Sequence, residues 1–435
     1  MLKRTAYEKL LEFKKSNAQR GMLIYGARQV GKTTLVREFG SKEYEYFAEI
    51  NFLANPYAVE SVLSAKDAKD LFLRLSALSN TQMVPGKTLV FLDEVQECKD
   101  VLTWLKFLQE DFNYDFILSG SMLGVDLFNV RSYPVGFIEE FEMFPMSFYE
   151  FCQACNLPNS LWETVVEAFN EKIRLPEFIH DKVLNLFYKY LLVGGMPQAV
   201  NEFVETGALS NVRITHSAIL KAYEKDVTKY VDNKIDRAHI KTIYRAVPNQ
   251  LNKPNKRFKF NKIEDGARFA HMQTAFDWLE YAGIVLPTLR TSDPLYPLNM
   301  SADISSFKLF FSDVGLLTSK LIGNVDVDIL NGRSNINFGS IFENAAAQEL
   351  KTSGYDLFYY YSTKFGEVDF VIQNEEGNIS LAEIKSGKDY KRHKAMNKLL
   401  QTKNYKFEHK YVFTEKNLEI VNDIEYLPIY MISLL

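Results

Sequence analysis

The stretch GARQVGKT, from Gly26 to Thr33, constrains the fold of this chain more than any other feature. It fits the pattern G-x-x-x-x-G-K-T, and it lies between a short apolar run, Met22 to Tyr25, and a helical run that starts near Lys32. Glycines let the backbone curl until successive N–H groups converge on phosphate oxygens at the start of a helix. The motif in this context therefore predicts a nucleotide-phosphate loop between a strand and a helix.

The residues of this loop have expected contacts with a nucleotide. Lys32 is predicted to reach the β- and γ-phosphates, and the hydroxyl group of Thr33 is predicted to ligate Mg²⁺. The residues expected to bind ATP along the loop are Gly26, Ala27, Arg28, Gln29, Val30, Gly31, Lys32, Thr33 and Thr34. The motif thus predicts ATP and Mg²⁺ as cofactors.

Two adjacent acids, Asp93 and Glu94, close the apolar run TLVFL. Because side chains alternate along a strand, the two are expected to point to opposite sides. Asp93 is predicted to hold Mg²⁺, directly or through water, and Glu94 to polarise the attacking water. Ser119 and Ser121, at the end of FILSGS, are candidates to place a hydroxyl group near the γ-phosphate. The alternative interpretations are a solvated strand end for the acids and ordinary small residues for the serines.

Residues 1–150 alternate apolar runs with helical runs. YEYFAEINF, TLVFLDEVQ and DFILSGS are typical of strands, and DVLTWLKFLQE is typical of an amphipathic helix. The apolar runs are too continuous for a sheet with one exposed face, so they predict a parallel sheet covered on both sides. We therefore expect a P-loop ATPase core over 1–150.

The rest of the chain divides into three parts. Residues 151–232 are mainly helical and predict a lid or connector, with a break at the two glycines of YLLVGGMPQAV. Residues 233–305 surround the basic stretch NKPNKRFKFNK and predict a small winged-helix-like module, or alternatively a scaffold or protein-docking element. Residues 306–435 alternate strands and helices again and predict a second α/β domain. The expected fold class is therefore α/β throughout, apart from the helical and winged-helix-like part.

Length and composition set the outer limits. A chain of 435 residues accommodates about two to four domains. The net charge of −4 argues against coating nucleic acid by bulk charge, although a local basic face is compatible with it. The amino-terminal MLKRTAYEKLLEFKK lacks the apolar core of a secretory signal, and no run approaches the roughly 18 apolar residues of a membrane span. We expect a cytoplasmic protein without a membrane partner, whose three cysteines are reduced.

A second constellation of charged residues lies in EVDFVIQNEEGNISLAEIKSG, from Glu367 to Gly387. If NEEGN is the turn of an antiparallel hairpin, Asp369 and Glu383 face each other with Cβ atoms about 5 Å apart. Lys385 then lies on the same strand face as Glu383. That separation suits two carboxylates that share one Mg²⁺ ion. The alternative is an exposed ion network, in which two opposed acids would be only half neutralised by one lysine.

This D…E-x-K pattern resembles that of PD-(D/E)XK nucleases. The resemblance implies that Asp369 and Glu383 bind Mg²⁺ or Mn²⁺, and that Lys385 orients or deprotonates water. It also implies a further acid from a preceding helix, which is Glu343 in IFENAAAQELK. Gln348 and Glu349 in the same run are expected at solvated helix positions. The predicted catalytic residues of the chain are therefore Glu94, Glu343, Asp369, Glu383 and Lys385.

Several blocks along the chain resemble one family. GARQVGKTTL, FLDEVQ, SGSMLG, PMSFYEF and LLVGGMPQAV are similar, in this order, to prokaryotic AAA+-type P-loop ATPases of the AAA-domain or archaeal type. In that family a C-terminal domain of uncharacterised function follows, and FFSDVGLL, GSIFENAAAQEL, GEVDFVI and AEIKSG match it. The resemblance spans nearly the whole chain.

Two positions depart from the family pattern. Ala27 takes the place of a proline in the loop, and Phe137 stands where the family often has Lys or Arg after the glycine of PVG. The second departure weakens the case for an arginine acting in trans from that position. Arg28 and Arg131 are the substitutes that the sequence offers.

Two basic stretches are candidates to contact the phosphates of a nucleic acid. One, after the E-x-K pattern, contains Lys388, Lys391, Arg392, Lys394, Lys398, Lys403 and Lys406, with Asp389 as its acid. The other contains Lys253, Lys256, Arg257, Lys259 and Lys262. The alternative for either stretch is a solvated helix face.

The sequence thus predicts an ATP-binding and ATP-hydrolysing AAA+ protein with a C-terminal metal-dependent nuclease or nucleic-acid-binding domain. DNA is the favoured nucleic acid, and RNA stays open. The alternative is a nucleotide-switched DNA- or protein-binding module whose nuclease fold is inactive. A homo-oligomer fits both interpretations, because AAA+ relatives often assemble into rings.

Overall fold

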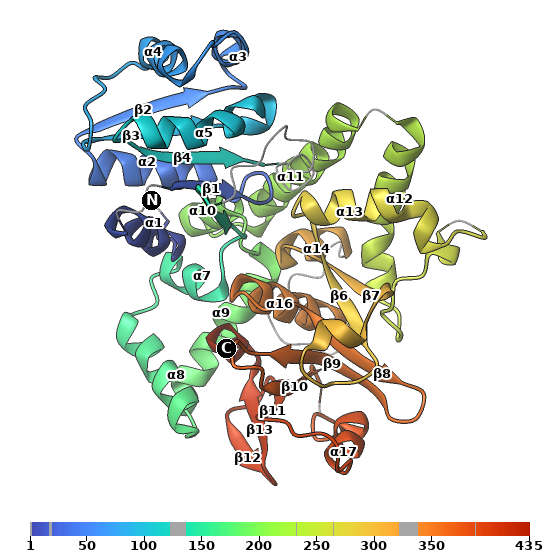
Figure 1. Cartoon of the computed structure of the whole chain (residues 1–435). Helices are drawn as coiled ribbons and strands as arrows, with labels where there is room; N and C mark the ends of the chain where they lie inside the picture. The colour runs from blue at the N-terminus through green and yellow to red at the C-terminus, as the bar shows by residue number, and fades with distance from the viewer. Residues whose placement is uncertain are drawn as a thin grey trace. The chain divides into compact units, whose positions relative to one another are not determined.

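The computed structural model describes residues 2–16, 20–121, 136–231, 233–263, 265–321, 338–387 and 389–435. These residues form two compact units (Figure 1). The first unit comprises residues 3–144 and 281–283, and the second comprises 145–280 and 284–435. Among the described helices, none combines the length and the apolar character that crossing a bilayer requires.

The first unit is built on a five-stranded parallel sheet, as the continuous apolar runs predict. Its strands follow the order β2-β3-β4-β1-β5. They are β1 (Gly21–Tyr25), β2 (Tyr46–Asn51), β3 (Thr88–Asp93), β4 (Asp115–Gly120) and β5 (Ile138–Glu142). Every residue of β3 is buried, because β3 has neighbours on both edges and layers on both faces.

The described helices of the first unit pack on this sheet or, in the case of α1 (Ala6–Lys15), on α2 (Lys32–Glu43). The others are α3 (Pro56–Leu63), α4 (Ala68–Leu78) and α5 (Asp100–Asp111). In α5 the buried Val101, Leu105 and Leu108 recur at helical spacing and join a core that includes Leu92 and Phe116 of the sheet. The amphipathic helix that the sequence predicts over this run is therefore present.

The second unit begins with a helical part and continues into a mixed sheet. Its helices before the sheet are α7 (Phe148–Ala154), α8 (Asn159–Glu171), α9 (Glu177–Val193), α10 (Pro197–Thr206), α11 (Leu209–Tyr230), α12 (Lys234–Leu251) and α13 (Phe269–Tyr281). Further along the chain lie α14 (Val314–Leu321), α16 (Phe338–Thr352), α17 (Lys394–Leu400) and the 3₁₀ helix η5 (Ile429–Leu434).

The sheet of the second unit has eight strands in the order β12-β13-β11-β10-β9-β8-β6-β7. They are β6 (Val285–Thr291), β7 (Ala302–Phe311), β8 (Phe358–Ser362), β9 (Gly366–Gln373), β10 (Ile379–Lys385), β11 (Lys410–Thr414), β12 (Glu419–Val421) and β13 (Ile424–Pro428). The boundary expected between 305 and 306 thus falls within β7. Because β6 pairs with both β7 and β8, the strand after α13 is part of this larger sheet.

Helix α16 is buried along nearly its whole length. It contacts α9, α14 and η5 as well as β6, β7 and β10, so no side of it is left to solvent. Gln348 and Glu349 are each only 1% exposed, and the expectation that they are solvated is wrong. A helix covered on all sides must supply partners for its polar groups internally.

Those partners come from distant parts of the second unit. Gln348 accepts a hydrogen bond from the backbone N–H of Val314 (2.8 Å) and donates to the hydroxyl group of Tyr190 (2.9 Å). Glu349 Oε1 accepts from the N–H of Phe148 (2.9 Å) and lies 2.9 Å from the hydroxyl oxygen of Tyr190. Tyr190 in turn donates to the carbonyl of Met146 (2.8 Å). The segment that enters the second unit is therefore clamped to α9 and α16.

Candidate functional site

The stretch GARQVGKT forms the loop that the sequence predicts, between the end of β1 at Tyr25 and the start of α2 at Lys32. Gly26 and Gly31 have φ angles of +133° and +98°, which side chains other than glycine rarely adopt. A Cβ atom on Gly26 would lie 2.2 Å from the carbonyl oxygen of Met143. The loop conformation therefore requires glycine at both ends.

The residues that follow β5 hold this loop by hydrogen bonds. The N–H of Met143 donates to the carbonyl of Tyr25 (2.8 Å). The guanidinium group of Arg4 donates to the carbonyls of Val30 (2.7 Å) and Phe144 (2.8 Å), so it joins the loop to the chain just beyond β5. The loop is therefore fixed from outside as well as by its own glycines.

Lys32 lies inside the curl of the loop. Its ammonium group donates to the carbonyls of Gly26 (3.0 Å) and Ala27 (2.8 Å) and is buried. Burial lowers the pKa of Lys32 to about 8, although the carboxylates of Glu94 and Asp93 oppose this shift. A buried cation surrounded by backbone groups favours an anionic partner, and a nucleotide phosphate is such a partner.

Three elements converge on the carboxylate of Asp93 at the end of β3. The hydroxyl group of Thr33, at the start of α2, lies 3.2 Å from both carboxylate oxygens. Asn51, at the end of β2, donates from Nδ2 to Oδ2 at 2.8 Å. Ser119, on β4, donates to Oδ1. Hydroxyl and carboxylate oxygens are ligands that Mg²⁺ prefers, so this set fits a magnesium–nucleotide complex.

The environment of Asp93 combines opposing electrostatic effects. Burial raises its pKa above the usual value, and the hydrogen bonds from Ser119, Thr33 and Asn51 lower it. Thr33, Asp93 and Ser119 were singled out from the sequence, and the structure brings them together. Asn51 was not, because its place beside Asp93 depends on the pairing of β2 with β3, in which the two residues are register partners.

Glu94 lies just outside the strand. Its φ and ψ of 57° and 46° are left-handed, so the alternation of strand side chains ends at Asp93 and does not fix where Glu94 points. Its carboxylate accepts a hydrogen bond from the side chain of the buried Gln96, which sequence reasoning did not single out. Arg28 donates from Nε to the hydroxyl group of Ser121 (3.1 Å), whereas Arg131 lies outside the described residues.

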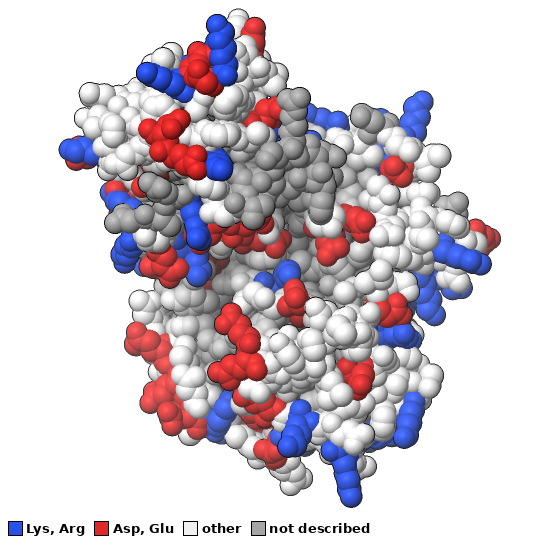
Figure 2. All heavy atoms as spheres, viewed as in Figure 1, with Lys and Arg blue, Asp and Glu red and all other residues white. Residues whose placement is uncertain are grey.

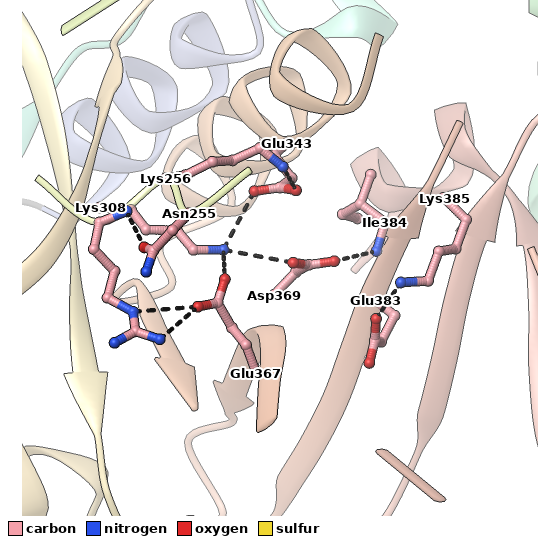
Figure 3. Close-up of polar contacts among 10 residues, drawn as sticks. Asn255, Lys256, Lys308, Glu343, Glu367, Asp369, Glu383, Ile384 and Lys385 are labelled. Carbon is pink, nitrogen blue, oxygen red and sulfur yellow. Dashed lines mark hydrogen bonds and ion pairs between the residues drawn. The ribbon is translucent and has the colours of Figure 1, made fainter. Parts of the chain in front are cut away.

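The charged residues near the carboxyl end of the chain form a second cluster, with Lys308 at its centre (Figure 3). Lys308 is on β7 and is fully buried. Its Nζ atom lies 3.0 Å from Glu367 Oε1, 3.3 Å from Glu343 Oε2 and 3.5 Å from Asp369 Oδ1. Burial by itself lowers the pKa of this ammonium group, but the three carboxylates outweigh burial and raise the pKa above its ordinary value.

The hairpin of β9 and β10 has the register that its sequence predicts. The ladder ends at the pair Ala382 and Phe370, and one further step places Glu383 opposite Asp369. The two carboxylates are nevertheless directed at different partners (Figure 3). Asp369 faces Lys308 and accepts the N–H of Ile384 (2.9 Å), whereas Glu383 Oε2 lies 2.5 Å from Lys385 Nζ.

The two carboxyl groups also titrate in opposite directions. Burial raises the pKa of Glu383 to about 7, and the neighbouring Asp369 carboxylate adds to that shift. Burial also acts to raise the pKa of Asp369, but Lys308, Lys385 and Lys256 together lower it below its usual value. Within the described ranges, no three His, Cys, Asp or Glu side chains come together in a way that could hold a metal ion. The arrangement thus differs from a pair of acids around a shared metal.

The basic stretch before α13 contributes to this cluster. Lys256 pairs with Glu343, and Arg257 pairs with Glu367 at 3.4 Å while its guanidinium carbon lies 3.2 Å from the ring centre of Tyr361. The remaining residues of the two basic stretches are exposed: Lys253, Lys259, Lys262, Lys391, Arg392, Lys394, Lys398, Lys403 and Lys406. Lys388 lies outside the described residues. On the face shown in Figure 2, Lys and Arg side chains alternate with acids.

Three family models match successive parts of the chain. Residues 18–152 match an AAA domain, and this confirms the prediction of a P-loop ATPase domain of AAA type. Residues 184–326 match a domain of unknown function, DUF8612, and residues 338–432 match another, DUF4143. No protein with a curated description matches the chain.

Several solved structures match the chain at low identity and with low TM-scores. The Walker-type ATPase PABY2304 of Pyrococcus abyssi matches with 14% identity and a TM-score of 0.43, covering 74% of this chain and 96% of that one. The Orc1 protein of Aeropyrum pernix, solved in complex with DNA, matches with 12% identity and a TM-score of 0.29, covering 76% and 94%. The RuvB Holliday junction branch migration motor of Thermotoga maritima matches with 15% identity and a TM-score of 0.29, covering 66% and 90%. With TM-scores this low, we take no residue role from these proteins.

Proposed function

We propose that this chain hydrolyses ATP with Mg²⁺ at the carboxyl end of β3. The observation that carries this proposal is the convergence of Thr33, Asn51 and Ser119 on the buried carboxylate of Asp93. The match of residues 18–152 to an AAA domain supports it.

The residues of the site have separate tasks in this reaction. Lys32 neutralises negative charge on the phosphates, and Thr33 and Asp93 hold Mg²⁺. Bound Mg²⁺–ATP supplies the scissile phosphoanhydride bond and a metal ion that offsets its charge. Glu94 accepts a proton from the attacking water, and to do so it must exchange the hydrogen bond from Gln96 for one to that water.

The proposal is tested by comparing ATP binding with ATP turnover. Lys32→Ala should abolish binding of a fluorescent ATP analogue, because the loop loses its buried cation. Glu94→Gln should bind the analogue normally and lose turnover. Lys42→Ala, on the same helix and paired with Glu38 at the surface, is the matched control and should change neither property. Full turnover in Glu94→Gln would show that another group activates the water.

For the second unit, we propose that it binds nucleic acid, preferably DNA, and that ATP binding or hydrolysis changes how it is held there. The exposed lysines and arginines of the two basic stretches support this role. The alternative is that the second unit also cleaves the bound nucleic acid, in a metal-dependent reaction carried out by Glu343, Asp369, Glu383 and Lys385. One observation favours binding without cleavage: the ammonium group of Lys308 lies among the carboxylates that would hold the metal.

Cleavage and binding are distinguished by assays on single- and double-stranded DNA and RNA with Mg²⁺ or Mn²⁺, with and without ATP. Cutting that disappears in both Asp369→Ala and Lys385→Ala would establish a nuclease. Binding that persists in EDTA, without cutting under any condition, would establish the binding module. Absence of both would refute a nucleic-acid role. The cytoplasmic location and the homo-oligomer expected from the sequence stay predictions.

A further inference from the structure

The cluster around Lys308 contains equal numbers of anionic and cationic side chains. Its carboxylates are Glu343, Glu367, Asp369 and Glu383, and its cations are Lys256, Arg257, Lys308 and Lys385. Each cation pairs with at least one of these carboxylates. A protein site for a divalent cation instead keeps an excess of negative charge that the ion neutralises. Here the charges of the protein already balance.

The ammonium group of Lys308 also occupies the space between these carboxylates. It contacts carboxylates from two separate elements, Glu343 on α16 and both Glu367 and Asp369 on β9. A metal ion that bridged these elements would occupy the same space as the ammonium group. Mg²⁺ also requires oxygen ligands at about 2.1 Å, and a cation at contact distance would repel it. The lysine and a divalent ion therefore exclude each other.

The surroundings of Lys308 give its side chain no alternative location. Its neighbours along β7, Phe307 and Leu309, are buried, and its backbone pairs with Thr288 of β6. The ring of Tyr359 lies 5.2 Å from Nζ, a distance typical of a cation–π contact. Moving the ammonium group away from its carboxylates would bury it without a partner, which is strongly unfavourable. The lysine is therefore a fixed part of the cluster.

We propose that Lys308 is the resident cation of this cluster and that it keeps the cluster free of divalent metal ions. The inference rests on the proposed role of the second unit as a binding module. It adds a cause: a lysine from β7 takes the place that a metal ion would need among these acids. The cluster then acts as an internal brace that joins β7, β9, β10 and α16.

Mn²⁺ binding to the nucleotide-free protein, measured by electron paramagnetic resonance, tests this inference. All proteins carry Asp93→Asn, which removes the magnesium ligand of the first unit. With Lys308 intact, we expect no Mn²⁺ site that depends on Asp369. Lys308→Ala removes the charge and opens space, and it should bind Mn²⁺ at least about tenfold more tightly. Adding Asp369→Asn to Lys308→Ala should abolish that gain.

Two results of the Mn²⁺ measurement would overturn the inference. Mn²⁺ bound by the protein with Lys308 intact, and lost on Asp369→Asn, would overturn the inference, whether or not Lys308→Ala folds. A folded Lys308→Ala variant without any gain would also overturn it. If circular dichroism shows that Lys308→Ala does not fold, Lys308→Gln serves as the neutral variant. DNA binding in EDTA is measured separately, so its failure would refute the proposed function without affecting the Mn²⁺ result.

Discussion

Replacing Glu349 by glutamine should stabilise the second unit at alkaline pH and change little at acidic pH. Burial raises the pKa of Glu349 to about 8, and the hydrogen bonds from Tyr190 and Phe148 oppose this only in part. Between about pH 4.5 and about pH 8 the unfolded chain ionises this group while the folded chain keeps it protonated. The contribution of Glu349 to the free energy of unfolding is therefore fully present below that window, and it is lost as the pH rises through it. The glutamine stays neutral throughout and keeps an oxygen that accepts from Phe148.

The expected magnitude follows from the single proton involved. One group that is protonated only in the folded state changes the free energy of unfolding by up to about 1.4 kcal/mol per pH unit. We expect the wild-type chain to lose about 1 kcal/mol per pH unit relative to Glu349→Gln between about pH 5 and about pH 8.

Urea unfolding at several pH values measures this difference. Trp104→Phe in all variants removes the tryptophan of the first unit, so the fluorescence of Trp162 and Trp278 reports on the second. Glu163→Gln, on the exposed face of α8, is the control and should leave the pH profile unchanged. Parallel profiles for the wild-type chain and Glu349→Gln would refute the reasoning, because Glu349 would then not be held protonated.

Three further outcomes are expected. Asn51→Ala should lower kcat for ATP hydrolysis about tenfold with ATP binding retained, because the carboxylate at the end of β3 loses one donor; steady-state and binding assays distinguish the two effects. The affinity for ATP should fall as the pH rises through about 8, where free Lys32 loses its proton; a pH-independent titration of a fluorescent ATP analogue would contradict this. Gly195→Ala should lower the thermal stability of the second unit, because its Cβ atom would lie 2.0 Å from the carbonyl oxygen of Met146. Gly387→Ala is the control, because its Cβ atom would meet no atom within 4 Å, and thermal unfolding followed by circular dichroism compares the two variants.

Features that depend on neighbouring residues could be predicted from the sequence. The phosphate loop is specified by glycines a few positions apart, and α2 starts at Lys32 as expected. The register of β9 and β10 follows from the turn between them, because a hairpin turn fixes which residues oppose each other. The continuous apolar run of β3 indicated a strand buried on both faces, and it is one.

Features that depend on contacts between distant segments could not be predicted from the sequence. Lys308 lies on a strand whose place in the sheet depends on β6, and no local pattern brings it beside Asp369. The contact of Asn51 with Asp93 could not be predicted for the same reason, because it depends on the pairing of β2 with β3. The burial of Glu349 could not be predicted for another reason: a charged residue on a helix usually faces solvent, but α16 is surrounded on all sides.

Residues 143–148 are held by hydrogen bonds at both ends. They are held to the phosphate loop through Arg4 and Met143, and the chain is held again a few residues later, where Met146 and Phe148 bond to Tyr190 and Glu349. Only a few residues of main chain therefore separate the hydrogen bonds at the phosphate loop from those at α16, the helix that carries Glu343.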